Sequence, residues 1–186
     1  LQEYEGLVPT LNNIGTIYYN YYFDIEKAME YFQKNVHICQ RINNMSFLSF
    51  NYNNIAEMYR EKDKYKESLD YYNKALEAII KTPNKYSETV IYTNKASVYV
   101  ALEDYKKAVS CIEKAEEILS ASKDIGEAIL YYYVLKALFY YKMGYFQKAM
   151  SYAQKTVDMC TSLGKETDYE ALYIILLCKS ILYKDL

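Results

Sequence analysis

Three asparagines stand at matched places about 40 residues apart, and their side-chain amides are the groups in this sequence best suited to binding chemistry. They are Asn13, Asn54 and Asn94, and each precedes a small residue by two positions. An asparagine amide offers both a hydrogen-bond donor and an acceptor. A series of such amides can therefore hold the backbone of an extended peptide without reading its sequence. The spacing predicts a peptide-binding surface, although the matched residue of the fourth segment is Leu135.

A structural role for the same asparagines is the alternative. The amides could cap linkers or hydrogen-bond to neighbouring helices. The sequence is also rich in Asn, Lys and Tyr, a composition typical of A/T-rich genomes, and this raises the number of asparagines by chance. The agreement in register across three segments is the observation that favours ligand binding.

Other polar and aromatic side chains fall at helical spacing from the small residues. Glu57 comes one position after such a residue, and Tyr19, Arg60 and Tyr141 come four positions after one. We expect Arg60 to hold a carboxylate of the ligand and Tyr141 to hold an apolar side chain. The predicted binding residues are Asn13, Asn54, Asn94, Glu57, Arg60 and Tyr141.

The sequence contains no arrangement of residues typical of a catalytic or metal site. His37 is the single histidine, and we expect it to pack or to face solvent rather than to act as a base. Glu116 and Glu117 are adjacent, so they do not face one another on a helix. The five glycines form no phosphate-binding loop, and the four cysteines form no CxxC pair. We therefore predict no catalytic residue, no metal and no cofactor, and thiols that serve as small buried side chains.

Composition narrows the choice of partners. The formal net charge is -2, whereas binding to a nucleic-acid backbone needs a surplus of Lys and Arg. No apolar run reaches the roughly 18 residues of a membrane span, and no signal peptide is visible. These features predict a protein without nucleic-acid or membrane partners, and the unpaired cysteines favour the reducing cytoplasm.

Four similar segments of about 40 residues make up most of the chain. Each has a small residue three positions before an aromatic residue: Gly15–Tyr18, Ala56–Tyr59, Ala96–Tyr99 and Ala137–Tyr140. A second small residue follows in each: Ala28, Ser68, Ala108 and Ala149. We expect the aromatic rings to fill the spaces between repeats. Lysines precede some of the small residues, and their stems should pack while their ammonium groups reach water: Lys95, Lys136 and Lys179.

Apolar residues recur at spacings of three and four, which predicts two amphipathic helices in each segment. The first helices are expected at about 8–20, 46–61, 86–102 and 126–143. The second helices are expected at about 25–42, 65–81, 105–121 and 146–162, with a ninth at 167–184. Pro9 should mark the first turn of its helix, while Pro83 and Gly164 should follow helix ends. The predicted organisation is a single array of repeats at about 8–45, 46–85, 86–125 and 126–166, followed by an unpaired helix at 167–185.

This arrangement resembles the tetratricopeptide repeat, and the resemblance covers nearly the whole chain. Phe32 and Tyr72 keep the aromatic that the family places in the second helix, whereas Ile112 and Ala153 do not. The family also places a final small residue in the second helix, and at that position the first repeat of this chain has Asn35. The resemblance implies an all-α, right-handed superhelical solenoid whose first helices line a concave groove for a peptide or protein.

The repeats are longer than the usual 34 residues of the family. In this they are similar to the repeats of kinesin light chains and of bacterial peptide-sensing regulators. The resemblance therefore implies the sensor or regulatory part of a larger bacterial signalling protein. Chaperone-binding members carry a lysine four residues before such an asparagine, where this chain has Pro9, Phe50, Val90 and Tyr131. A lysine clamp for a terminal carboxylate is not expected.

The final predicted helix carries a different signal. Residues 172–178 are apolar on all sides of the helix, which must therefore be covered. Lys179–Tyr183 repeats the first-helix pattern, so we expect the full protein to continue past Leu186. The alternative function is a structural scaffold that self-associates through residues 170–184. Replacing Ile175 or Leu176 with a charged residue is expected to break such a homodimer.

Overall fold

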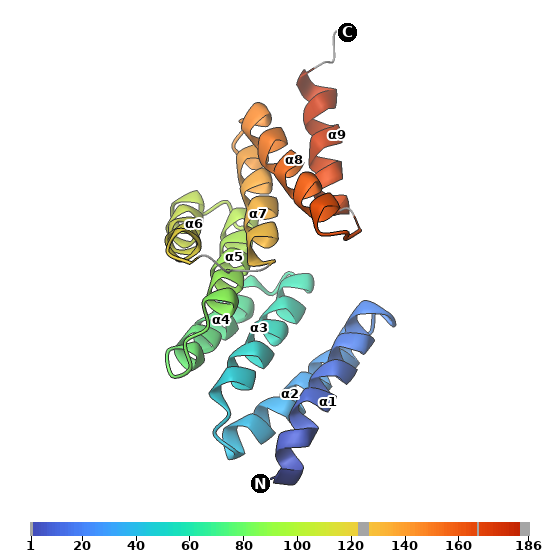
Figure 1. Cartoon of the computed structure of the whole chain (residues 1–186), viewed down its shortest axis with the longest axis vertical. Coiled ribbons are helices and arrows are strands. Elements are labelled where there is room, and N and C mark those ends of the chain that lie inside the picture. Colours follow the sequence, from blue (N-terminus) through green and yellow to red (C-terminus); the bar gives the residue numbers. More distant parts are fainter. Residues whose placement is uncertain (1, 123–126, 167, 183–186) are drawn as a thin grey trace. The chain divides into compact units, whose positions relative to one another are not determined.

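The computed structural model describes residues 2–122, 127–166 and 168–182, and every regular element among them is an α-helix. The helices are α1 Gln2–Asn20, α2 Ile25–Arg41, α3 Met45–Glu61, α4 Tyr65–Ile79, α5 Lys85–Ala101, α6 Tyr105–Ser120, α7 Ala128–Lys142, α8 Phe146–Ser162 and α9 Tyr169–Leu182. The chain divides into two compact units, residues 1–91 and 92–186, and α5 contributes to both. Figure 1 shows the helices in chain order, from α1 in blue to α9 in red.

Helices that follow one another in the chain pack together within each unit. In the first unit α1 packs on α2, and α3 packs on both α2 and α4. In the second unit α6 packs on α7, α7 packs on α8, and α9 lies against α8 and α7. The predicted all-helical succession of two-helix repeats is confirmed.

The bounds of the helices agree with the sequence prediction to within a few residues, with one exception. The first helix begins at Gln2 rather than at about residue 8, and Pro9 lies inside it. Proline is rare in a helix interior because it lacks an N–H group. Tertiary packing favours the longer helix, since Val8 is fully buried and its C=O accepts a hydrogen bond from Asn35 Nδ2 at 2.9 Å. The predicted ends at residues 126, 167 and 184 fall outside the described residues.

Local signals set several helix ends. Asp24, Asn44 and Asp104 are N-caps whose side chains accept hydrogen bonds from the N–H three residues later, at 3.0, 3.1 and 3.2 Å. The turn before the second helix of each repeat contains one residue with left-handed φ: Phe23, Asp63, Glu103 and Gly144. As predicted, Gly164 follows α8 with a φ of 64°, and α4 ends before Pro83.

The small residues bring the two helices of a repeat into close contact. At Gly15, α1 approaches α2 so closely that an added Cβ would lie 2.8 Å from the ring of Phe32. Phe32 is 2% exposed and packs in a core that includes Val8, Ile55 and Met58. Alanines stand at the matched small positions of the other repeats and have no exposed surface: Ala56, Ala96 and Ala137.

The aromatic residues of the pattern stack on one another inside a repeat, and in the first unit they also pack against a core built from both repeats. In three repeats the aromatic of the first helix stacks on a tyrosine of the second helix, with ring centroids 5.4, 5.4 and 5.6 Å apart. The pairs are Tyr18–Tyr31, Tyr59–Tyr71 and Tyr140–Tyr152. In the remaining repeat Cys111 stands at the place of the second tyrosine. The rings therefore fix the pairing of helices within each repeat.

Candidate functional site

Arg60 on α3 lies at the centre of a network of polar side chains in the first unit. Its Nη2 donates to Glu57 Oε2 and to Glu61 Oε1, both at 2.9 Å. The other oxygen of Glu57 accepts a hydrogen bond from the hydroxyl of Tyr72, a fully buried residue on α4. The spacing of three residues puts Glu57 and Arg60 on one helix face, as the sequence predicts. Tyr72 fixes the carboxylate of Glu57 from the neighbouring helix.

The charges of this network are fixed by its surroundings. Burial lowers the pKa of Arg60, but the charge of Glu57 and the nearby Tyr72 and Glu61 outweigh this and raise it, so the guanidinium stays protonated. Burial, and then the charge of Glu57, raises the pKa of Tyr72, so its hydroxyl remains a donor. Two carboxylates share one guanidinium, which leaves an excess of one negative charge. A ligand carboxylate at Arg60 would have to displace one of these two glutamates.

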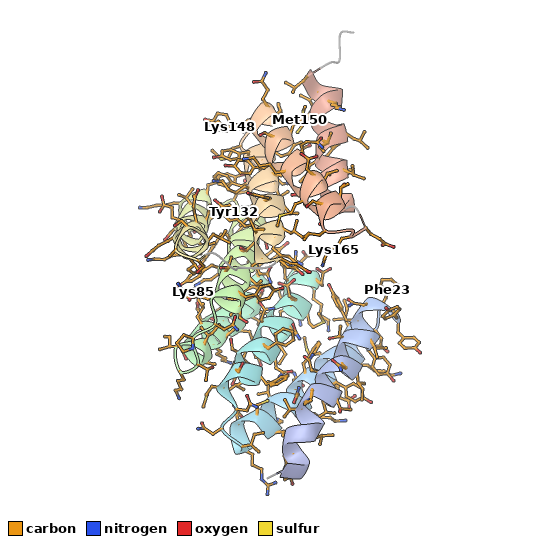
Figure 2. All side chains as sticks on the ribbon, viewed as in Figure 1. Phe23, Lys85, Tyr132, Lys148, Met150 and Lys165 are labelled. Atoms are coloured by element: carbon orange, nitrogen blue, oxygen red, sulfur yellow. The ribbon has the colours of Figure 1, made fainter. Side chains whose placement is uncertain are left out.

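A hollow of about 330 Å³ opens beside the network, where the end of α1, the start of α2 and the end of α3 meet. It is lined by Tyr19, Asn20, Phe23, Ile25 and Glu61. Burial, and then the charge of Glu61, raises the pKa of Tyr19, which keeps this hydroxyl neutral. Figure 2 shows Phe23 at the turn between α1 and α2, where its side chain is largely exposed. The sequence pattern pointed to Tyr19 but gave no sign that Phe23 would face a hollow.

Asn13 and Asn54 both belong to the first unit. Asn54 Nδ2 on α3 donates to Asn12 Oδ1 on α1 at 3.3 Å, so the first helices of adjacent repeats meet at this point. Asn13 is exposed, whereas Asn54 is half-buried. Asn54 therefore makes the kind of bond to a neighbouring helix that the structural alternative describes, and its partner is Asn12. The side chain of Asn13 is left on the surface.

Asn94 and Tyr141 belong to the second unit. Asn94 is half-buried on α5, and its C=O accepts a hydrogen bond from Ser97 Oγ at 2.7 Å. Tyr141 is half-buried on α7, with its ring 5.9 Å from that of Phe146 on α8. The role of these two residues in binding stays a prediction.

Two other asparagines are fully buried and hold the first unit together. Asn35 Nδ2 donates to the C=O of Val8 at 2.9 Å and to Asn51 Oδ1 at 3.1 Å. Asn51 Nδ2 donates to the C=O of Phe47 at 2.7 Å. These bonds connect α1, α2 and α3 through groups that would be costly to bury unpaired. The sequence signal for this role was that Asn35 stands at a position where the family pattern has a small residue.

Lys136 on α7 is almost entirely buried, so its ammonium group has less contact with water than expected from the sequence. Its side chain is 9% exposed, and its Nζ lies 3.7 Å from Glu116 Oε2. The ring centroids of Tyr132, Tyr140 and Tyr152 lie 5.3, 5.8 and 5.0 Å from this Nζ. Burial lowers the pKa of Lys136, but hydrogen bonds with Tyr132 and Tyr152 outweigh this and raise it. The aromatic faces and Glu116 thus stabilise a buried ammonium group; Tyr132 is labelled on α7 in Figure 2.

The cysteines are free and buried, as predicted. Burial raises the pKa of the Cys39 thiol to about 11, which keeps it in the unreactive protonated form at neutral pH. His37 is exposed on α2. In the described part of the chain, no group of His, Cys, Asp and Glu is placed to hold a metal ion. None of the helices seen in that part has both the length and the apolar character needed to cross a membrane.

The last helix has a buried face and an exposed apolar face. Ile174, Ile175 and Cys178 pack in a core with alanines of α8. Tyr173 and Leu176 are 61% and 65% exposed. A charged residue in place of Ile175 would therefore damage the core of the second unit. A charged residue in place of Leu176 would leave that core intact and would test a surface contact.

Comparison with protein families gives two matches, both to models described as tetratricopeptide repeat. They cover residues 48–121 and 130–161, together more than half of the chain. The chain belongs to the tetratricopeptide repeat family. No curated protein matches this tetratricopeptide repeat chain.

Solved structures with a similar fold include BtubC (BKLC) from P. vanneervenii, at 17% identity and a TM-score of 0.68 over 89% of this chain and 67% of that one. A STAND signal transduction ATPase with a tetratricopeptide repeat sensor, from Pyrococcus horikoshii, has 23% identity and a TM-score of 0.65. A kinesin light chain candidate from Podosopora anserina, built of TPR-like repeats, has 13% identity and a TM-score of 0.64 over 96% of this chain and 88% of that one.

These likenesses, all below 25% identity, show the fold: a TPR-like solenoid of helix pairs. The match with the STAND protein covers 83% of this tetratricopeptide repeat chain and only 24% of that protein. The present chain therefore corresponds to a part of that longer molecule.

Proposed function

We propose that this chain is a non-catalytic module that binds a peptide or an extended segment of a partner protein. The first helices α1 and α3 would carry the binding surface in the first unit, with Asn13 and Asn54 holding the partner backbone and Glu57 and Arg60 beside them. The observation that carries the proposal is that Asn54, Glu57 and Arg60 follow one another at spacings of three on α3, while Asn13 is exposed on α1, the first helix that Asn54 contacts. Family membership supports it, since solenoid repeats present extended binding surfaces.

We infer that the module is the sensor or regulatory part of a larger bacterial signalling protein in the cytoplasm. The tetratricopeptide repeats of the STAND protein from P. horikoshii are described as a sensor, which supports this role by likeness of fold. The free, buried thiols are consistent with a reducing compartment. Asn94 and Tyr141 would serve binding in the second unit.

A pull-down from lysate of the source organism tests the binding surface. The bait is this chain, beside an Asn13→Ala/Asn54→Ala variant whose folding is checked by circular dichroism. Each lost hydrogen bond should cost about 1 kcal/mol, or roughly a fivefold loss of affinity for the same partner. A matched control, Gln33→Ala/Gln147→Ala, removes exposed amides from the second helices α2 and α8 and should retain the partner.

Equal retention of a partner by the parent chain and the Asn13→Ala/Asn54→Ala variant would contradict the binding surface. Retention of nothing but further copies of this chain would favour the second candidate, a scaffold that self-associates. The exposed Tyr173 and Leu176 of α9 are the observation that supports this candidate. In that case Leu176→Glu should abolish the self-retention.

A further inference from the structure

We infer that the hollow beside Glu61 receives the side chain of a lysine or arginine from the bound partner segment. This inference rests on the proposed function and adds the chemistry of one subsite. The hollow belongs entirely to the first unit, and its volume of about 330 Å³ leaves room for one long side chain. The residues that line it are Tyr19, Asn20, Phe23, Ile25 and Glu61, and Glu61 is the charged one among them.

The chemistry of the lining matches a long basic side chain. Apolar and aromatic walls suit the methylene stem of lysine or arginine, while the charged group prefers a carboxylate at the end. Aromatic faces add an attraction for a cation that neutral or anionic side chains do not gain. Neutral Tyr19 can also accept a hydrogen bond from an ammonium or guanidinium group.

The charges around the hollow also favour a cation. Glu61 shares the guanidinium of Arg60 with Glu57, so the two carboxylates are opposed by one positive charge. Lys62, which follows directly after α3, is paired with Glu26 on α2. The negative charge of the Glu57–Arg60–Glu61 group is therefore not cancelled locally, and a ligand carboxylate would be repelled by Glu61.

The conformation of Phe23 is the independent observation. Its φ is 53°, a left-handed value that bulky residues rarely adopt, and its side chain is 82% exposed. The equivalent turns of two other repeats have Gly144 and Asp63 at this position, residues that suit a left-handed φ better than phenylalanine does. An aromatic side chain with this exposure buries little apolar surface in the folded chain, so its place at the rim of the hollow points to a role in contact with a partner.

The test uses small probes, because the partner is not identified. Three N-acetylated tripeptide amides, Gly-Lys-Gly, Gly-norleucine-Gly and Gly-Glu-Gly, are titrated into the nitrogen-15-labelled chain and followed by NMR. The lysine peptide should bind with a Kd of about 5 mM and shift the amides of Tyr19, Phe23 and Glu61. Norleucine, which keeps the stem but lacks the charge, should bind at least threefold more weakly, and the glutamate peptide should cause no localised shifts.

Two variants make the test specific. Glu61→Gln should weaken the lysine peptide at least threefold, whereas Glu67→Gln, which removes an exposed glutamate from α4, should leave its Kd unchanged. Phe23→Gly should weaken the peptide while raising the midpoint of thermal unfolding by a few degrees, because glycine relieves the left-handed φ. Tyr21→Ala removes an exposed aromatic outside the hollow and should bind as the parent does.

Absence of localised shifts with the lysine peptide, or equal binding by Glu61→Gln, would overturn the inference. The proposed function can be judged separately with the captured partner. If Asn13→Ala/Asn54→Ala loses the partner while Glu61→Gln and Phe23→Gly retain it at full affinity, the binding surface stands and the basic subsite is wrong. If all of these variants retain the partner, both proposals fail.

Discussion

Replacing Asn35 with alanine is expected to lower the free energy of unfolding of the first unit by about 3 kcal/mol. Asn35 is fully buried, and its amide donates to the C=O of Val8 and to Asn51 Oδ1. Alanine removes both bonds, leaves the buried Asn51 Oδ1 without this donor, and opens a small cavity. Urea denaturation followed by circular dichroism measures the loss, and the exposed Asn13→Ala provides the control, with an expected change below about 0.5 kcal/mol.

A second variant distinguishes two causes of the lost stability, the amide left without a partner and the loss of side-chain volume. In Asn35→Leu/Asn51→Leu both partners become apolar, so no polar atom of this pair is left buried alone. The double variant should therefore recover most of the stability lost in Asn35→Ala. A loss below about 1 kcal/mol in Asn35→Ala would show that the amide network does not hold α1, α2 and α3 together.

Gly15→Ala is expected to destabilise the first unit by about 2 kcal/mol. Helix propensity alone predicts the opposite sign, a gain of roughly 1 kcal/mol, because alanine favours a helix interior over glycine. The sign is set by Phe32, whose ring would lie 2.8 Å from the new Cβ and is too deeply buried to move away freely. The same urea denaturation decides between the two effects.

The contact between Gly15 and Phe32 can be tested as a pair. Phe32→Leu shortens the side chain that meets the new Cβ, so Gly15→Ala should cost less in the Phe32→Leu background than in the parent chain. Ala56→Gly at the matched position of the second repeat is the control, and it should destabilise by propensity and lost packing. A stabilising effect of Gly15→Ala in the parent chain would contradict the close approach of α1 and α2.

The fold could be predicted from the sequence because its signals are local and repeated. Spacings of three and four gave the helices, and the small and aromatic residues in register gave the array. The start of α1 was missed because the rule for Pro9 is local, whereas the burial of Val8 and its bond to Asn35 are tertiary. The stacking partners of the aromatic rings could not be predicted, since the pattern gives the spacing of the rings but not the tyrosine of the second helix that each one meets.

The candidate site was predictable only in part. Helical spacing brought Glu57 and Arg60 together, but no pattern could show that Tyr72 of another helix fixes Glu57. Spacing also could not show that the side chain of Lys136 turns inward to three tyrosines. The hollow at Phe23 depends on a turn conformation and on three helix ends meeting, which are properties of the folded unit.

Photo-crosslinking tests the central claim, that a partner lies along the first helices of the repeats, most directly. Benzoyl-phenylalanine is placed at Asn13 on α1 or at Gln33 on α2, both exposed positions of the first unit, and the chain is irradiated in lysate of the source organism. A partner that lies along the first helices should give a covalent adduct from position 13 and none from position 33. An adduct from position 33 without one from position 13 would contradict the claim, because the partner would then lie on the second helices.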